Sequence, residues 1–425
     1  MLSMSKEAPR RDILKSGALA LGAPAVLSAL QATKAIKVGL VGCGGRGSGA
    51  AAQALKADDF SNLTAMADVF QERIDDSVSR LERIHKDKVK VEKANMYVGL
   101  DAYKKLIDSD IDVVLLATPQ GFRPEQLRYA IEKGKHVFCE KPMAVDAPGV
   151  RHVMETVKMA RDKKLNIVAG FCWRYSNYIV EVFDRVAKGD IGDIVNYYAT
   201  YYTNPVKPMP PASDRPAGMS DVEWQIRNWY NFTWTCGDSL VEQAIHSVDK
   251  VAWAMKDQPP VSCVAVGGRQ IPAHGGNIYD HFEVNYLYPN GVRAMVANRQ
   301  IEGCYNENSD YILGTKGQAI IGRGPNPRII GANEWTYSGQ KYDMYQREHD
   351  LLFQAIRKGE VMNDGDRMCA STMLGIMGRM AAYTGQQITW EQALNSQERI
   401  FPDNLDWNGK LDVAPLALPG KTRFL

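Results

Sequence analysis

The 425-residue sequence has little that would mark a membrane-spanning, nucleic-acid-binding or disulfide-stabilised protein. Lys and Arg number 51 against 49 Asp and Glu, so the formal net charge is only +2. Such a balance offers no basic surface for a nucleic acid. Hydrophobic residues make up 45% of the chain, but no apolar run is long enough to span a bilayer. These features indicate a globular protein, and the length is sufficient for two domains with separate cores.

Cysteine use excludes two further classes of protein. The seven cysteines are scattered, odd in number and never spaced as C-x-x-C; they stand at positions 43, 139, 172, 236, 263, 304 and 369. This argues against a disulfide framework and against a zinc site. We therefore predict no bound metal, and we expect several of these thiols to be small buried hydrophobes.

The N-terminus has the organisation of an export signal. Arg10 and Arg11 precede Asp12-Ile13-Leu14-Lys15, and residues 16–30 are apolar and rich in Ala, Gly and Leu. A charged start, a short apolar stretch and a small-residue exit are typical of such signals, and the paired arginines resemble a twin-arginine leader. The alternative is a basic amphipathic first helix. We predict a leader over residues 1–34, cleaved near Ala32, and a periplasmic or otherwise exported protein.

Export would constrain any chemistry that depends on a diffusible cofactor. A compartment outside the cytoplasm offers no pool of such cofactors, whereas the twin-arginine route carries proteins that are already folded. The cofactor would then travel bound. It would have to be reoxidised by a second substrate or regenerated within one turnover.

The strongest motif is a glycine loop that follows the first apolar strand. Residues 36–41 are apolar apart from Lys37, and Gly42, Gly44 and Gly47 then fall on G-x-G-x-x-G before a helix-forming stretch. In a dinucleotide fold the first glycine allows the turn, the second lets backbone approach the pyrophosphate, and the third brings helix and strand together. We predict that this loop, with Gly45 and Arg46, binds a dinucleotide.

Asp68 extends the dinucleotide prediction to the ribose. It ends a second apolar strand, residues 63–68, at about the interval at which an acidic residue binds the ribose 2′-hydroxyl. A carboxylate there repels a 2′-phosphate, so we expect NAD rather than NADP. The alternative is that Asp68 only caps the next helix.

Strands and helices alternate from residue 35 to residue 165, which predicts a parallel sheet flanked by helices. Two apolar strands, 111–117 and 136–139, are followed by polar and proline residues. Ligands bind at the carboxyl ends of parallel strands. This geometry places four more residues at the cofactor edge: Thr118, Pro119, Glu140 and Lys141.

Together, three motifs resemble one family. These are the glycine loop, A-T-P at residues 117–119, and G-K-H-V-F-C-E-K-P at residues 134–142. The combination is similar to the glucose–fructose oxidoreductase / inositol dehydrogenase / rhizopine-catabolism (Gfo/Idh/MocA) family. The resemblance implies that Lys141 lies near the nicotinamide and the reacting hydroxyl as a catalytic residue. A salt bridge with Glu140 is the alternative. The chain departs from the family at Arg123, where a histidine is common.

Residues 166–425 predict an α+β domain with a large, open and mainly antiparallel sheet. Strands are expected at 195–202, 261–266, 281–287, 292–298, 311–313 and 318–321, and helices at 350–358 and 370–384. Residues 171–175 resemble a family segment in which Arg174 would bind the substrate. The resemblance also implies that the open sheet pairs subunits into a homo-oligomer.

The segment 237–249 contains the main candidates for chemistry. Glu242, His246 and Asp249 are spaced i, i+4 and i+7, which predicts one shared helical face. Carboxylates on both sides could orient the imidazole and hold its pKa near the working pH. The segment resembles the family's G-G-x-x-x-D-x-x-x-H-x-x-D, which implies that His246 is catalytic and that Glu242 and Asp249 bind substrate. Glu242 replaces an aspartate, and a purely structural histidine is the alternative.

Residues 222–236 are rich in aromatic side chains, among them Trp229. Indole rings suit the apolar face of a sugar, and the polar residues between them suit its hydroxyls. We predict that Trp229 contacts the substrate. Core or interface packing is the alternative for these aromatic residues.

Together these features predict an NAD-dependent oxidoreductase. Hydride would pass from a ring carbinol of a sugar, cyclitol or glycoside to a tightly bound nicotinamide, and His246 or Lys141 would take the hydroxyl proton. One alternative is a redox-neutral NAD-dependent glycosidase of the α-N-acetylgalactosaminidase type, acting by oxidation, elimination, hydration and reduction. A non-catalytic sugar or NAD sensor is the alternative outside enzymology.

Overall fold

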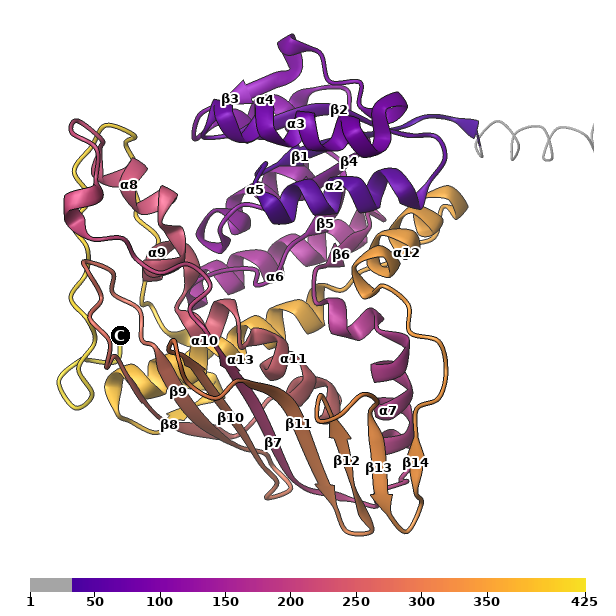
Figure 1. The fold of residues 1–425 in the computed structure, drawn as a ribbon, viewed down its shortest axis with the longest axis vertical. Coiled ribbons are helices and arrows are strands. Elements are labelled where there is room, and N and C mark those ends of the chain that lie inside the picture. Colours follow the sequence, from indigo (N-terminus) through magenta and orange to yellow (C-terminus); the bar gives the residue numbers. More distant parts are fainter. Residues whose placement is uncertain (1–32) are drawn as a thin grey trace, which may run out of the picture.

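A computed structural model describes residues 33–425 as two parts that meet along one side (Figure 1). The first is built on a six-stranded sheet and the second on a nine-stranded sheet. This arrangement confirms the predicted fold class. The predicted leader lies, apart from its last two residues, outside the described part of the chain.

The first sheet is parallel throughout and has the strand order β3-β2-β1-β4-β5-β6. Its strands are β1 (Ile36–Val41), β2 (Ser61–Asp68), β3 (Met96–Val98), β4 (Val113–Leu116), β5 (His136–Cys139) and β6 (Ile167–Ala169). Its connecting helices are α2 (Gly45–Ala57), α3 (Gln71–His85), α4 (Ala102–Asp108), α5 (Arg123–Glu132) and α6 (Ala147–Asp162). Helices cover both faces, and the strands therefore read as near-continuous apolar runs.

The sixth strand lies beyond the predicted domain boundary at residue 165. β6 pairs with β5 in parallel register, with Ile167 opposite Val137. All three residues of β6 are buried. The first domain therefore includes this short edge strand.

The second sheet has the order β14-β13-β12-β11-β7-β10-β9-β8-β15. Only the β7–β10 pair is parallel. The strands are β7 (Ile194–Thr203), β8 (Ser262–Gly268), β9 (His281–Leu287), β10 (Arg293–Gln300), β11 (Glu307–Gly314), β12 (Gly317–Ile321), β13 (Arg328–Gly331), β14 (Trp335–Thr336) and β15 (Ile388–Thr389). This extends the predicted set by three short strands.

Helices cover one face of the second sheet, on the side of the first domain (Figure 1). They include α10 (Ser239–Glu242), α11 (Ile245–Ala254) and α13 (Gly365–Thr384). α7 (Asn177–Ala187) and α14 (Trp390–Asn395) lie at the ends of this layer. α12 (Met344–Lys358) returns to the first domain and packs against α2, where Arg357 forms an ion pair with Asp58 at 2.7 Å.

A hydrophobic cluster with side chains from both domains joins them. Residues 204–236, which contain α8 (Asp221–Arg227) and α9 (Thr233–Cys236), lie beside the C-terminal segment in Figure 1. Val222, Phe232 and Trp234 are buried there and pack with Phe70 of the first domain. Trp407 closes the contact, with its ring centroid 5.7 Å from that of Phe70. Trp234 therefore serves packing between the domains.

Across residues 33–425 no helix is long and apolar enough to cross a membrane. All seven cysteines carry free thiols, and all except Cys304 are buried. The same described residues contain no group of three or more His, Cys, Asp or Glu side chains arranged to hold a metal ion.

Candidate active site

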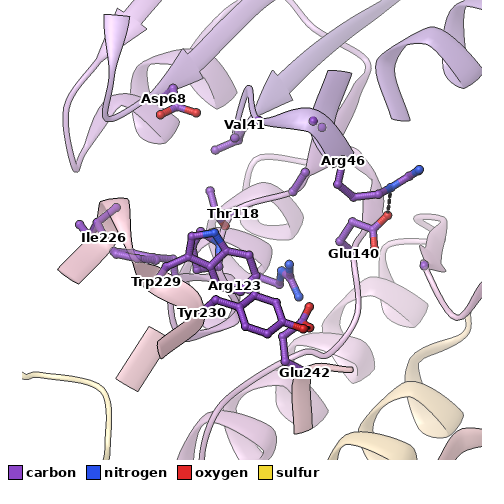
Figure 2. Close-up of a pocket in the computed structure, with 18 of the residues that line it drawn as sticks. Val41, Arg46, Asp68, Thr118, Arg123, Glu140, Ile226, Trp229, Tyr230 and Glu242 are labelled. Carbon is purple, nitrogen blue, oxygen red and sulfur yellow. Dashed lines mark hydrogen bonds and ion pairs between the residues drawn. The ribbon is translucent and has the colours of Figure 1, made fainter. Parts of the chain in front are cut away.

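A cavity of about 640 Å³ lies between the glycine loop of the first domain and the segments around β7, α10 and α11 of the second. Figure 2 shows Asp68 and Arg46 at its upper edge and Trp229, Tyr230 and Glu242 across from them. The cavity opens at the carboxyl ends of β1, β2, β4 and β5, where a dinucleotide fold binds its ligand.

The glycines of the loop have distinct physical reasons to lack a side chain. Gly42 adopts φ +91°, and a Cβ there would meet the Ala117 carbonyl carbon at 2.7 Å. A Cβ on Gly47 would lie 1.9 Å from the Gly42 oxygen, so only glycine lets α2 pack this closely. At Gly44 and Gly45, by contrast, a Cβ would meet no protein atom within 4 Å. The open space beside the N-terminus of α2 suits a pyrophosphate.

Asp68 is held at the end of β2 by main-chain donors. The Cys43 N–H donates to Asp68 Oδ2 at 2.6 Å, and the Phe70 N–H donates to Oδ1 at 3.0 Å. Burial raises the pKa of this carboxyl group above its usual value. The carboxylate lines the cavity, where it would accept a hydrogen bond from a ribose hydroxyl. The loop and Asp68 together therefore fit NAD.

Thr118, Pro119, Glu140 and Arg46 also line the cavity. Arg46 donates from Nε to Glu140 Oε1 at 2.5 Å, as the dashed line in Figure 2 shows. Glu140 is 4% exposed, and the Arg46 guanidinium compensates its buried charge. The predicted alternative partner of Glu140, Lys141, forms its ion pair elsewhere.

Lys141 reaches across the domain boundary to Glu242. Its Nζ donates to the main-chain oxygen of Glu242 at 2.6 Å and to its side-chain Oε1 at 3.2 Å. The lysine side chain is 11% exposed and lines the cavity. A tetrahedral amine bonded to Cε and engaged in two hydrogen bonds has one remaining direction for a proton or a lone pair. Because Lys141 lines the cavity, a ligand bound there could approach the amine.

The predicted single helix through Glu242, His246 and Asp249 is wrong. α10 ends at Glu242 and α11 begins at Ile245. The Glu242 carbonyl accepts from Lys141 Nζ, whereas the His246 N–H donates weakly to Gln243 O at 3.4 Å. The break places the three side chains in different surroundings.

His246 lines the cavity, but neither predicted carboxylate orients its ring. Its Nδ1 is buried and has no hydrogen-bond partner. Burial, followed by the nearby Lys141 and Lys250 ammonium groups, lowers its pKa well below the usual value. The expectation of a pKa held near the working pH is therefore wrong, and the imidazole is neutral at physiological pH.

Arg174 and Asp249 were predicted to bind substrate, but the structure pairs them with each other outside the cavity lining. Arg174 donates from Nε to Asp249 Oδ1 at 3.0 Å and from NH2 to Asp257 Oδ1 at 2.6 Å. Ser371 Oγ donates to Asp249 Oδ1 at 2.7 Å. Both members of the pair are buried. A guanidinium and a carboxylate suit a structural ion pair as well as they suit a substrate-binding site.

Trp229 lines the cavity with its indole ring, at the place the aromatic segment predicted (Figure 2). The structure adds aromatic and polar residues that sequence patterns did not single out, namely Trp173, Tyr201, Gln243 and Asn308, and it places Tyr230 of the aromatic segment 222–236 in the same lining. Tyr201 lies on β7, and its hydroxyl donates to Gln243 Oε1 at 2.8 Å. The one sequence feature that could have pointed to Tyr201 as a cavity residue was its inward-facing position on β7.

Arg123, which stands where the family often has a histidine, lines the cavity floor while remaining 5% exposed. Its NH1 donates to the Pro142 oxygen at 2.6 Å, and its Nε has no partner. Burial lowers the pKa of this guanidinium. Arg123 thus holds the turn that carries Lys141.

Comparisons with known proteins bear on the fold and the family of the chain. Residues 36–171 match the oxidoreductase family with an NAD-binding Rossmann fold, and residues 179–320 match the GFO/IDH/MocA C-terminal domain. The structure is similar to a levoglucosan dehydrogenase in complex with NADH and levoglucosan, with a TM-score of 0.67 and 18% identity, covering 84% of this chain and 99% of that one.

Two curated relatives match to different extents. The glycosyl hydrolase family 109 protein 1 of Shewanella sp. (strain ANA-3) is 27% identical over 87% of this chain and 84% of its own length. The dTDP-3,4-didehydro-2,6-dideoxy-alpha-D-glucose 3-reductase of Actinomadura kijaniata is 28% identical over 41% of this chain. The chain spans about half, 47%, of that reductase.

The buried Arg174–Asp249 pair leads to a prediction about stability. We expect Asp249→Asn to lower the free energy of unfolding by about 3 kcal/mol, because it leaves a buried guanidinium undercompensated. Urea denaturation measures this change. Asp257→Asn is the matched control, because the Asp257 side chain is 35% exposed and its loss should matter less. Unchanged stability together with a raised substrate KM would instead return Asp249 to substrate binding.

Proposed function

Because the chain belongs to the GFO/IDH/MocA oxidoreductase family, we propose that it oxidises a ring carbinol of a sugar, cyclitol or glycoside with a tightly bound NAD. The observation that carries the proposal is the position of the Lys141 amine, which makes two hydrogen bonds to Glu242 and lines a cavity with a dinucleotide loop on one side and Trp229 on the other.

We assign the proton of the reacting hydroxyl to Lys141. When bound, the nicotinamide supplies the acceptor for the hydride that leaves the carbinol carbon. Once the Lys141 ammonium has given up one proton, the amine would keep two N–H bonds on Glu242. Its lone pair would then lie in the third direction and take the O–H proton of the substrate as the carbonyl forms. The Glu242 carboxylate then stabilises the resulting ammonium. Positioned general bases of this kind contribute about 10²–10⁴ to the rate.

His246 and Trp229 have binding roles in this proposal. A histidine whose pKa is lowered well below its usual value is a weak base, so its neutral ring serves as a hydrogen-bonding partner for a second polar group of the substrate. The indole of Trp229 packs on the apolar face of the ring. The Asp68 carboxylate favours NAD over NADP.

A redox-neutral glycosidase is the second candidate, favoured by the relative that matches over 84% of its length. In this reaction the carbonyl acidifies the neighbouring C–H, the glycosidic substituent is eliminated, water adds, and the hydride is returned. The two candidates use the same first step and the same base. They differ in whether an aglycone is released and whether reduced cofactor persists.

One experiment separates them. Purified protein without added nicotinamide is incubated with free sugars and glycosides, while reduced-nicotinamide absorbance and product mass are followed. We expect one stoichiometric burst of reduced cofactor and a product lighter by two hydrogens. Lys141→Met should slow the burst by about 10²–10⁴, because the base is lost. Lys135→Met is the control, since that amine bonds to the Ser109 and Ile111 carbonyls on a distant part of the sheet. Free aglycone over many turnovers without lasting reduction would make the protein a glycosidase.

We further propose that the protein is exported by the twin-arginine route. The support is the sequence pattern around Arg10 and Arg11. Replacing both by lysine should keep the precursor in the cytoplasm, because that route reads the arginine pair, and cell fractionation of a tagged protein would measure this. Lys6→Gln is the control, and equal export of both variants would contradict the route.

We also propose that the open face of the second sheet pairs two subunits. Apolar side chains are exposed there, among them Val264 at 44% and Val266 at 69% on β8 and Leu313 at 37% on β11. A patch of this kind on a flat sheet favours association. Val266→Asp should shift the molar mass from dimer to monomer in light scattering, whereas Ile84→Asp, at a site 67% exposed on α3, should not. A wild-type monomer would disprove the proposal.

A further inference from the structure

Glu242 has a second buried partner that the mechanism above does not use. The Tyr230 hydroxyl donates to Glu242 Oε2, while Glu242 Oε1 accepts from Lys141 Nζ at 3.2 Å. The two carboxylate oxygens are thus divided between a phenol and an ammonium. Figure 2 shows the Tyr230 hydroxyl beside the Glu242 carboxylate, with the ring lying against Trp229. Tyr230 is 4% exposed and Glu242 is 6% exposed.

Tyr230 remains a hydrogen-bond donor under all ordinary conditions. Burial, followed by the Glu242 charge, raises the pKa of its hydroxyl well above the usual value. A phenol that does not ionise presents its O–H to the carboxylate continuously. Hydrogen bonds to an ionised acceptor are also about twice as strong as neutral ones.

The backbone around Tyr230 is fixed to the second domain. Tyr230 lies in a short 3₁₀ helix, η6 (Trp229–Asn231). Thr235 Oγ1 donates to the Trp229 oxygen at 2.5 Å, and the Asn277 N–H donates to the Asn231 oxygen at 3.0 Å. The ring centroids of Trp229 and Tyr230 are 5.0 Å apart. The phenol is therefore a rigid reference point for the carboxylate.

A second cation, the Arg123 guanidinium, interacts with the charge of the Glu242 carboxylate. It lies on the same side of the cavity as Glu242, and its Nε has no partner. Without the Tyr230 hydroxyl, Glu242 Oε2 would lose this donor, and the carboxylate would be held less firmly against Lys141.

We infer that Tyr230 is a positioning residue for the reaction: by fixing Glu242 Oε2 it keeps Oε1 on Lys141 and so aims the free direction of the amine at the substrate. The inference rests on the proposed function for its kinetic consequence. Its structural content, the orientation of the Lys141 amine, is independent of which substrate is used.

The first test is Tyr230→Phe, which removes only the hydroxyl. Here kcat is the rate constant of the burst of cofactor reduction at saturating substrate, and KM is the substrate concentration that gives half of that rate. We expect kcat to fall about tenfold and KM to change less than about twofold, because the lost interaction orients the base and does not bind the substrate. Tyr286→Phe is the matched control. It removes an equally buried phenol that donates to the Leu374 oxygen at 2.8 Å away from the cavity, and it should leave kcat unchanged.

A double-mutant cycle tests whether Tyr230 acts through Glu242. In a Glu242→Gln background, Tyr230→Phe should change kcat by less than about twofold, because coupled residues are not additive. Effects that multiply would mean that Tyr230 touches the substrate directly, and this would overturn the positioning role. An unchanged kcat in the single Tyr230→Phe variant would also overturn it.

A spectroscopic measurement separates this inference from the proposed function. In protein labelled with ¹⁵N-lysine, the Lys141 ammonium protons that bond to Glu242 should exchange slowly with water, and Lys141→Met identifies the signal by its loss. Tyr230→Phe should speed this exchange several-fold, whereas Tyr286→Phe should not. Equal exchange in both variants overturns the inference even if the enzyme oxidises sugars. Faster exchange in Tyr230→Phe alone supports it even if no tested carbohydrate is a substrate.

Discussion

The contact between Lys141 and Glu242 is the interaction on which the site depends. It joins the turn after β5 in the first domain to the start of the helical layer in the second, across 101 residues of sequence. The contact is made at the Glu242 carbonyl, where α10 ends and shortly before α11 begins. It therefore fixes the Lys141 amine beside the Glu242 carboxylate and the main chain at this point. An amine with two of its directions fixed is preorganised, which lowers the cost of orienting it during the reaction.

Charged side chains at the cavity and behind its lining form ion pairs with neighbouring groups of opposite charge. Arg46 pairs with Glu140, and Arg174 pairs with Asp249 and Asp257. Burial makes an unpaired charge costly, so these pairs maintain the shape of the site without taking part in chemistry. Among the residues that line the cavity, Lys141, His246 and Arg123 keep polar atoms that are not fully engaged by protein partners. In the proposed reaction it is this partnering, more than residue type, that leaves Lys141 and His246 able to contact the substrate.

The apolar contacts between the domains serve the same geometry. The cluster of Phe70, Val222, Phe232 and Trp234 with the C-terminal Trp407 holds residues 204–236 against the first domain. Arg227 lies over the Phe70 ring at 3.9 Å and pairs with Glu72 at 2.8 Å. Trp229 and Tyr230 follow directly in the chain. Their position in the cavity therefore depends on packing between segments far apart in sequence.

Local sequence determined the dinucleotide half of the site. The glycine spacing, the buried strands and the acid at the end of β2 depend on turn geometry and on apolar runs, which are properties of a few adjacent residues. For the same reason the bounds of β5 and β9 agree with prediction. The family resemblance placed Lys141 in the cavity as well.

Only the tertiary structure decided the substrate half. The spacing of Glu242, His246 and Asp249 predicted one helical face, but the helix is interrupted between Glu242 and Ile245, where Lys141 of the first domain meets the Glu242 carbonyl. Arg174 and Asp249 carry the residue types of a binding site, yet they neutralise each other because their elements pack together. Tyr230 acquires its role from a carboxylate twelve residues away that points back to it. Contacts of this kind depend on how domains meet, and the meeting surface is set by many weak packing interactions that the sequence specifies only collectively.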